Sequence, residues 1–338
     1  MPVDRDADEQ AAETVRQLRA LATPAGAAAL SRAAELLAGG ADAVSALTRL
    51  RAALARAGAR VVAVDRDPVA RELTRLNTAA LGLTGVEVRD ADVVDLVAGA
   101  ADGRVAGCDA AVLDPARRAG GSRRLDPDRW SPPWSTVAAL LDRVPVSVVK
   151  VAPGLDHDRV PAGIEAEWVS AGGSIAEALL WGPGRAATWR RATVVRDGAV
   201  HELTADADPG TAPAGPVGAW LHEPDPAVIR SGLVALVADG LGATLVDPTI
   251  AYLTSDAAAA SPWVRSFRVD EVLPFHLKRL KALLRTRGVG RVTVKKRGSA
   301  IEPETLARQL RGSGARAATV VVTRVAGAPT VLVCDLSR

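Results

Sequence analysis

The sequence predicts an α/β chain in which a parallel sheet, covered by helices on both faces, precedes a smaller basic α+β domain. Two observations predict this. Between residues 60 and 153, short apolar runs alternate with helical patterns, and strands that are apolar throughout are typical of a parallel sheet buried on both sides. Beyond residue 216 the pattern becomes mixed and strongly basic. The 338 residues, 48% of them hydrophobic, suffice for two domains with ordinary cores.

The expected elements follow in order along the chain. Residues 1–57 form an N-terminal helical segment rich in Ala, Leu and Arg, in which Pro24 would break a helix. Residues 58–204 form the α/β domain. Its strands are predicted near 60–65, 86–93, 108–115 and 145–153, and its helices near 68–82 and 134–144. The runs 165–170 and 176–181 are expected to pair, and 189–203 to form a hairpin that turns at Asp197 and Gly198.

The last third of the chain is predicted to be a separate domain. Residues 205–216, rich in Pro, Gly and Ala, are typical of a linker. In residues 217–338 the patterns indicate helices near 225–239, 270–287 and 303–311. They also indicate strands near 291–296 and 317–334.

Charge is unevenly distributed between these regions. The formal net charge is +3, but residues 263–338 hold 16 Lys and Arg against 5 Asp and Glu, so the rest of the chain is acidic overall. The most basic stretch, 276–298, has nine Lys and Arg and no acid. Such asymmetry favours binding of a polyanion, although a basic run can also be a solvated surface.

Several classes of protein are disfavoured by the sequence. No apolar run reaches membrane-spanning length and the first ten residues are acidic, so we expect a cytoplasmic protein with no membrane partner. Cys108 and Cys334 are far apart and form no metal-spaced pair, so they are expected to be free thiols. No metal site is predicted, and the oligomeric state does not follow from the sequence.

Three acids stand where predicted strands end: Asp65, Asp92 and Asp114. In an open parallel sheet, ligands bind beyond the carboxyl ends of the strands. A carboxylate at the first position can accept both ribose hydroxyls, and one at the second can accept an adenine amino group. Strands also end in Asp because of turn geometry alone. Three acids in register favour a nucleoside-shaped ligand.

The motif that Asp114 opens, DPARR, could carry chemistry. Proline after the acid fixes a rigid turn, and the carboxylate could accept a hydrogen bond from a nitrogen that is to be alkylated. Arg117 would suit phosphate or carboxylate contacts. Shortly after, Trp130 and Trp134 flank a Ser-Pro-Pro, where they could either stack a flipped base or simply cover the sheet edge. Lys150, at the end of the next strand, is expected at the cleft rim.

The order of the motifs VAVDRDP, RDADV, DAAVLDPARR, RRLDPDRWSPPWS and VKVAPG resembles that of class I S-adenosylmethionine-dependent methyltransferases. With the basic tail that contains TVKKRG, it resembles more narrowly the bacterial methyltransferase-like proteins that end in a THUMP-like domain. The resemblance covers about residues 55–337. It implies a Rossmann-like catalytic domain, the cofactor S-adenosylmethionine, and RNA, either tRNA or rRNA, as the substrate.

The resemblance also assigns roles to residues. The predicted cofactor-binding residues are Asp65, Arg66, Asp92 and Val93, and the predicted catalytic residues are Asp114, Pro115, Arg117 and Trp134. Asp65 would bind the ribose and Asp92 the adenine, whereas Asp114 and Pro115 form the catalytic-loop motif. Members that methylate amino groups carry an aromatic residue where Arg117 stands, so the atom that is methylated stays open.

One part of the family pattern is absent from the sequence. The family has a first strand and a glycine-rich loop before the strand that ends at Asp65, and that loop lets the backbone approach the methionine half of the cofactor. Here residues 36–62 run from one helical pattern into the next, with Gly39 and Gly40 too far upstream. We therefore expect a sheet without its first strand and a weakened cofactor site.

Three functions remain open at this point. The chain could be an RNA methyltransferase, a catalytically silent RNA-binding protein on the same fold, or a nicotinamide-dependent oxidoreductase, which the acid after VVAV alone suggests. For either RNA-binding function, we expect one basic face to grip the RNA backbone. The residues predicted to form it are Lys278, Arg279, Lys281, Arg285, Arg287, Arg291, Lys295, Lys296 and Arg297.

Overall fold

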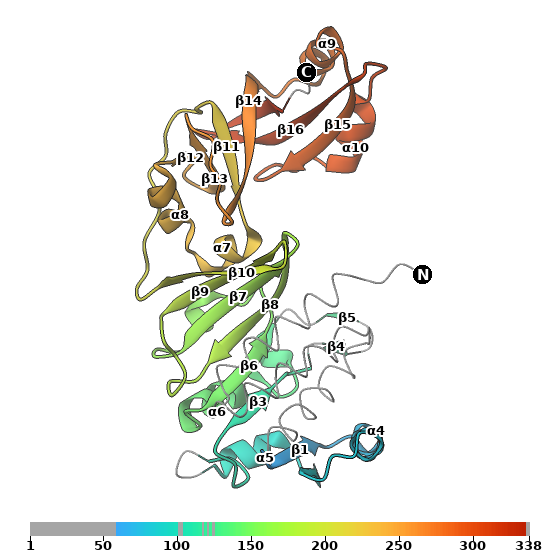
Figure 1. Cartoon of the computed structure of the whole chain (residues 1–338), viewed down its shortest axis with the longest axis vertical. Helices are drawn as coiled ribbons and strands as arrows, with labels where there is room; N and C mark the ends of the chain where they lie inside the picture. Colours follow the sequence, from blue (N-terminus) through green and yellow to red (C-terminus); the bar gives the residue numbers. More distant parts are fainter. Residues whose placement is uncertain (1–58, 101–103, 117, 120–121, 124–125, 336–338) are drawn as a thin grey trace. The chain divides into compact units, whose positions relative to one another are not determined.

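The computed structural model describes residues 59–100, 104–116, 118–119, 122–123 and 126–335 (Figure 1). The chain divides into two compact units, Met1–Ala207 and Asp208–Arg338, so the division falls within the residues expected to form a linker. The predicted N-terminal helical segment, and with it the predicted absence of a strand before residue 59, lies outside the described residues.

The first unit contains parallel and antiparallel strands. They are β1 (Val61–Asp65), β2 (Val86–Asp90), β3 (Ala111–Leu113), β4 (Arg118–Ala119), β5 (Ser122–Arg123), β6 (Ser147–Val151), β7 (Glu165–Ala171), β8 (Ser174–Trp181), β9 (Arg190–Arg196) and β10 (Ala199–Ala205). The expected pairing of β7 with β8 is confirmed, as is the hairpin β9–β10. Its turn residues Asp197 and Gly198 have φ of 52° and 73°, as a two-residue hairpin turn requires.

Within the described part of the first unit, the sheet is interrupted between β1 and β3. Of the described strands, β1 pairs only with β2, and the larger sheet has the order β10-β9-β7-β8-β6-β3. Among the described residues, no strand pairs with the other edge of β1 or of β3. Rossmann-type sheets run in the order 3-2-1-4-5-6, so the interruption falls where a first strand would stand, between the second and the fourth.

Helices connect the two parts of this sheet. α4 (Pro68–Ala80) packs on β1 and β2, and α5 (Val93–Ala98) packs on α6 (Trp134–Arg143), which in turn packs on β6. At the end of α6, Arg143 donates to the carbonyl oxygens of Val97 and Ala98 at 2.9 Å each, which fixes α5 against α6. Two 3-10 turns, Pro127–Arg129 and His157–Arg159, complete the unit.

The second unit is built on one seven-stranded sheet with the order β12-β13-β11-β14-β17-β16-β15. Its strands are β11 (Trp220–Pro224), β12 (Thr244–Asp247), β13 (Ile250–Ser255), β14 (Val264–Pro274), β15 (Val289–Lys296), β16 (Arg316–Val325) and β17 (Ala328–Cys334). β15 and β16 are parallel and are joined through α10 (Pro303–Leu310), whereas the other neighbours are antiparallel.

This sheet curls strongly around one of its faces. Glu223 on β11 and Lys295 on β15 lie four places apart in the strand order, which in a flat sheet would separate them by about 19 Å. Their side chains nevertheless meet at 2.6 Å. The concave face encloses a cluster that includes Leu221, Tyr252 and Phe267, and the opposite face carries α9 (Leu277–Thr286) and α10 over a second apolar cluster.

Two predicted helices of this unit need correction. The helix expected over 225–239 is two helices, α7 (Pro226–Ser231) and α8 (Val234–Leu241), separated at Gly232, whose φ of 79° no regular helix can accommodate. The helix expected from residue 270 begins only at Leu277, because residues 271–274 pair with β17 as the end of β14. The strand expected over 317–334 is the hairpin of β16 and β17. No helix among the described residues is long and apolar enough to cross a membrane.

Candidate functional site

Asp65 and Asp92 lie at the carboxyl ends of two adjacent parallel strands. Asp65 is the last residue of β1, and its Oδ1 accepts a hydrogen bond from the backbone N–H of Asp67 at 2.9 Å. Asp92 follows β2 and caps α5, with Oδ1 accepting from the N–H of Val94 at 2.9 Å. Val93 is the first residue of α5, a position where backbone N–H groups have no partner within the helix. Asp65, Asp92 and Val93 thus lie beyond the carboxyl ends of β1 and β2, on the β1 side of the interruption in the sheet.

Arg66 spans this interruption. One terminal nitrogen donates to Asp92 Oδ2 at 3.1 Å, and the other donates to Ser131 Oγ at 3.2 Å. Ser131 belongs to the SPPW motif on the β3 side of the sheet. The carboxylate assigned to the adenine is therefore already engaged by Arg66, which is 67% exposed and can reorient at little cost. The contact between Ser131 and Arg66, a predicted cofactor-binding residue, was not predicted from the sequence.

On the β3 side, the two loop motifs are fastened to each other. The backbone of Ala116, in DPARR, pairs with that of Ser131, in SPPW, through hydrogen bonds of 2.8 and 3.1 Å. Pro115 is buried and Asp114 is exposed, so this pairing holds the acid at the open end of β3. Arg117 lies outside the described residues.

The two tryptophans of this region are buried. Trp130 and Trp134 are 3% and 8% exposed, and their rings pack edge to face with centroids 6.3 Å apart. Trp134 opens α6, whose buried face includes Leu140 and Leu141, so its ring belongs to the core beneath the loop. This burial favours the interpretation in which these side chains cover the sheet, whereas the catalytic role of Trp134 stays a prediction.

Lys150 contacts two acids, Asp114 and Glu177. Its Nζ is 3.8 Å from Asp114 Oδ2 and 3.3 Å from Glu177 Oε2. Glu177, on β8, is 3% exposed, so its carboxylate contacts the ammonium group of Lys150 from the buried side. Lys150 thus places a positive charge beside Asp114. No pattern in the sequence pointed to Glu177, because β8 is otherwise an apolar strand.

The predicted basic residues of the second unit do not form one face. Lys278, Arg279, Lys281 and Arg285 are exposed on the outer side of α9, and no described carboxylate lies within ion-pair distance of them. Lys295 instead points to the concave side of the sheet, where it pairs with Glu223 and lies over the ring of Phe267.

The other predicted cations of the second unit are divided between these two sides. Lys296 lies on the helix side and pairs with Glu302 at 3.2 Å, and Arg287 pairs with Glu271. Arg297 packs over the ring of Tyr252, with 5.1 Å between its Cζ and the ring centroid. Arg291, on β15, is exposed. The helix group, defined as Lys278, Arg279, Lys281 and Arg285, is therefore the solvent-facing part of the predicted surface.

Comparison with known proteins identifies the relatives of the chain. Over 308 residues it is 37% identical to an uncharacterized S-adenosylmethionine-dependent methyltransferase of Mycobacterium tuberculosis strain H37Rv, and equally to that of strain CDC 1551. The match covers 88% of this chain and 81% of each relative. The chain belongs to this methyltransferase family. Residues 264–336 of the methyltransferase also match the family described as THUMP domain-like.

A solved structure supports the fold. The crystal structure of a candidate methyltransferase from Porphyromonas gingivalis W83 superposes with a TM-score of 0.59 at 19% identity, covering 82% of this chain and 71% of the other. The α/β methyltransferase fold with a THUMP-like C-terminal domain, inferred from the motifs, is therefore confirmed. Family membership leaves the nicotinamide alternative without support. Among the described residues, no group of three or more His, Cys, Asp or Glu could hold a metal ion.

The residues present fit one half of S-adenosylmethionine. Asp65 offers acceptor oxygens at the end of β1 for ribose hydroxyls, and the start of α5 offers an acid and backbone N–H groups to an adenine. The residues that would face the methionine half precede β1 and lie outside the described part of the chain. The described part of the chain can therefore be compared with the adenosine half alone.

Proposed function

We propose that the protein transfers a methyl group from S-adenosylmethionine to RNA, tRNA or rRNA being the substrates that the family resemblance favours. The observation that supports an RNA substrate is the helix group: four exposed cations without described carboxylate partners, on a unit that matches a THUMP-like family. Proteins bind RNA backbone through such unneutralised Lys and Arg.

In this proposal, residues of the first unit bind and orient the reactants. Asp65 binds the ribose of the cofactor and Asp92 its adenine, once Arg66 has turned away from Asp92. The bound cofactor supplies an electrophilic methyl group. Asp114, beside Lys150, accepts a hydrogen bond from the nitrogen that attacks the methyl group, and so orients the lone pair of that nitrogen.

Cofactor binding tests the first half of the proposal. By calorimetry, S-adenosylmethionine should bind the wild type, and Asp65→Ala should weaken that binding by about 10- to 150-fold, because a charge-assisted hydrogen bond contributes roughly 1.5–3 kcal/mol. Asp109→Ala, which removes an exposed acid outside the site, is the control. Equal affinity of Asp65→Ala and wild type would show that the assigned site is wrong.

A second function, RNA binding without catalysis, is favoured by one observation: the glycine-rich loop that the family has before the strand ending at Asp65 is absent from the sequence. A labelling experiment distinguishes the two functions. RNA from a strain that lacks the gene is incubated with the protein and methyl-labelled S-adenosylmethionine. Label in the RNA, abolished in Asp114→Asn, supports methyl transfer. RNA binding without cofactor binding or label supports the silent protein.

A further inference from the structure

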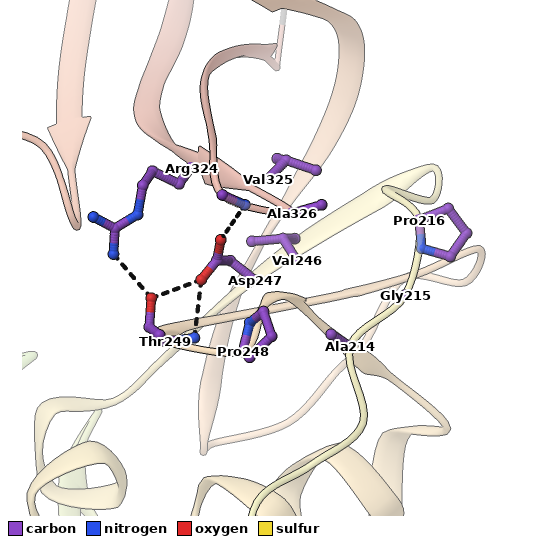
Figure 2. A pocket seen from close by; sticks show the side chains of 11 residues that line it. Ala214, Gly215, Pro216, Val246, Asp247, Pro248, Thr249, Arg324, Val325 and Ala326 are labelled. Atoms are coloured by element: carbon purple, nitrogen blue, oxygen red, sulfur yellow. Dashed lines mark hydrogen bonds between the residues drawn. The ribbon is translucent and has the colours of Figure 1, made fainter.

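Two buried acids of the chain lie next to open surface, and they differ in what they contact. In the second unit, Asp247 is 2% exposed and lies at a pocket of about 840 Å³ (Figure 2). Its Oδ1 accepts from the N–H and the hydroxyl of Thr249 at 2.9 and 2.7 Å, and its Oδ2 accepts from the N–H of Gly327 at 2.7 Å. These bonds tie the β12–β13 turn to the β16–β17 turn, so Asp247 stabilises the frame of this pocket.

In the first unit, the buried acid Glu177 contacts a cation instead. It is 3% exposed, and its Oε2 lies 3.3 Å from Lys150 Nζ. Leu179 and Trp181, the next two residues on its face of β8, pack with Val148 of β6 in an apolar cluster. Burying a carboxylate in such surroundings is costly, and an apolar residue would pack there at lower cost. The acid therefore points to a functional requirement for the cation that it contacts.

The register of the sheet puts Lys150 between two acids. Leu113 of β3 pairs with Val149 of β6 in parallel, so Asp114 and Lys150, the next residues, also stand beside each other. On the other edge of β6, β8 places Glu177 on the same face of the sheet as Lys150. Lys150 thus lies at the carboxyl ends of two adjacent parallel strands, where ligands of such sheets bind.

Lys150 and Asp114 both keep hydrogen-bonding capacity for a ligand. An ammonium group has three N–H donors, and each carboxylate oxygen can accept more than one hydrogen bond. Lys150 Nζ and Asp114 Oδ2 are 3.8 Å apart, which is longer than a hydrogen bond. Their side chains are 37% and 33% exposed, so a polar group of a ligand can reach both. The pair therefore offers one donor and one acceptor side by side.

The group that complements this pair is flat and has a donor next to an acceptor. Nucleobases present this arrangement, since the N6 amino group of adenine lies on the same edge as the acceptor N7. In unpaired bases the Watson–Crick edge is accessible too, and there the amino groups of adenine and cytosine adjoin a ring nitrogen that accepts. A ring nitrogen without a hydrogen, such as N7 of guanine, has nothing to donate to Asp114.

We propose that Lys150 is a further substrate-contacting residue of the methyl transfer and that Glu177 is the residue that positions it. Asp114 accepts from the amino group that is methylated, and Lys150 donates to the ring nitrogen beside that group. As the amino nitrogen gains the methyl group, its proton passes to Asp114, and the pair of electrons of the former carbon–sulfur bond stays on sulfur. The inference rests on the proposed function and deepens it by naming the substrate group, an amino group next to a ring nitrogen.

RNA with an altered base tests the contact. RNA from a strain that lacks the gene is labelled by the full-length protein and digested to identify the methylated base. Synthetic RNA of that sequence then carries either the natural base or its deaza analogue, in which carbon replaces the ring nitrogen. The wild type should have about ten- to a hundredfold lower kcat/KM on the deaza RNA, because a hydrogen bond from a charged group is lost. Lys150→Met should be slow on both RNAs and should not distinguish them.

Further variants separate positioning from folding. Glu177→Gln should lower kcat/KM less than Lys150→Met does, because its amide oxygen still accepts from Lys150, and Lys150→Arg should recover part of the activity. Arg104→Met removes an exposed cation that pairs with Asp109 at 2.8 Å, and is the matched control. Calorimetry should give an S-adenosylmethionine affinity within about twofold of wild type for every variant, since none changes a residue assigned to the adenosine half. If Lys150→Met does not fold, Lys150→Met/Glu177→Gln, which leaves no unpaired buried charge, takes its place.

The outcomes distinguish the contact from the proposed function. Discrimination against the deaza RNA by Lys150→Met as strong as that by wild type would overturn the contact and leave methyl transfer to RNA standing. Label on a ring nitrogen, such as N7 of guanine, would overturn it as well. No label in RNA with the wild type would overturn the proposed function itself.

Discussion

Lys295 reaches across the concave side of the C-terminal sheet to Glu223, and both side chains are largely buried, at 25% and 20% exposed. Removing one partner of such a pair leaves the other charge poorly solvated. We expect Lys295→Ala to lower the free energy of unfolding by about 1–3 kcal/mol in urea denaturation. Lys278→Ala, on the outer side of α9, is the matched control and should change it by less than about 0.5 kcal/mol.

This comparison also guides RNA-binding experiments. A variant that combines changes at Lys295, Lys296 and Arg297 would disturb the fold and the RNA contacts together. A decrease in stability in Lys278→Ala as large as in Lys295→Ala would show that the assignment of the two sides is wrong.

His222 is fully buried between two serines, with its ring nitrogens 2.9 Å from Ser266 Oγ and Ser255 Oγ. Both serine hydroxyls also donate hydrogen bonds to backbone carbonyls. A neutral ring has only one N–H, so its other nitrogen accepts a hydrogen bond only if one serine turns its hydroxyl proton toward the ring. Burial lowers the pKa of His222 below its ordinary value of 6.5. Burial therefore disfavours the charged form of the ring.

A lowered histidine pKa makes stability depend on pH in a defined direction. As pH falls below about 6.5, the unfolded chain takes up a proton that the folded chain does not, so the free energy of unfolding should decrease. Above about pH 6.5 this contribution is constant. Urea denaturation between about pH 7.5 and 5.5 measures it, and the slope should be smaller in His222→Gln. The same slope in both proteins would contradict a neutral buried ring.

At the scale of elements, Gly232 separates α7 from α8 because its φ of 79° reverses the chain there. A side chain is strained in that conformation, so Gly232→Ala should lower the free energy of unfolding by about 1 kcal/mol. Gly240, inside α8, has open space around the position of a Cβ. Gly240→Ala should raise the free energy of unfolding by about 0.5–1 kcal/mol. Denaturation of both variants should therefore give shifts of opposite sign.

The same helices show how far the sequence predicts the elements. Strands that are apolar throughout, such as β1 and β6, and the Asp-Gly hairpin follow from local pattern alone. β11, β12 and β13 do not, because they are four to six residues long and are stabilised by partners distant in the sequence. The start of β14 and its extension to Pro274 likewise depend on β11 and β17.

The candidate site was predictable to a similar extent. The acids at strand ends follow from the alternation of strands and helices, so Asp65, Asp92 and Asp114 could be named from the sequence. The Arg66 bridge and the Lys150–Glu177 contact could not, since each depends on how separate loops meet. Long-range contacts also decided the position of Lys295, which the charge pattern alone placed on a solvated face.

At the scale of the whole molecule, the two compact units have separate tasks in the proposed function. The first holds the strand-end acids of the cofactor site, and the second holds the helix group. Residues 208–338 carry 17 Lys and Arg against 11 Asp and Glu, so the unit is basic by itself. Both of its apolar clusters are formed by its own residues.

A unit with its own core and its own charge should fold and bind alone. We expect residues 208–338, expressed separately, to unfold cooperatively on heating and to bind structured RNA within about threefold of the full-length affinity, because the phosphate contacts lie in this unit. The fragment should not bind S-adenosylmethionine, since Asp65 and Asp92 are absent from it. Circular dichroism and filter binding measure the first two properties, and calorimetry the third. An unfolded fragment would show that the second unit depends on the first.

The salt dependence of RNA binding by this fragment tests the helix group directly. Each Lys or Arg that neutralises a phosphate releases counterions, so log K falls linearly with the logarithm of the salt concentration. Lys278→Ala/Lys281→Ala/Arg285→Ala should flatten that slope by about two to three units, because each cation removed takes away roughly one phosphate interaction. Filter binding across a salt series measures both slopes. A folded fragment with an unchanged slope would show that the helix group is solvated surface, and that the RNA is bound elsewhere in the chain.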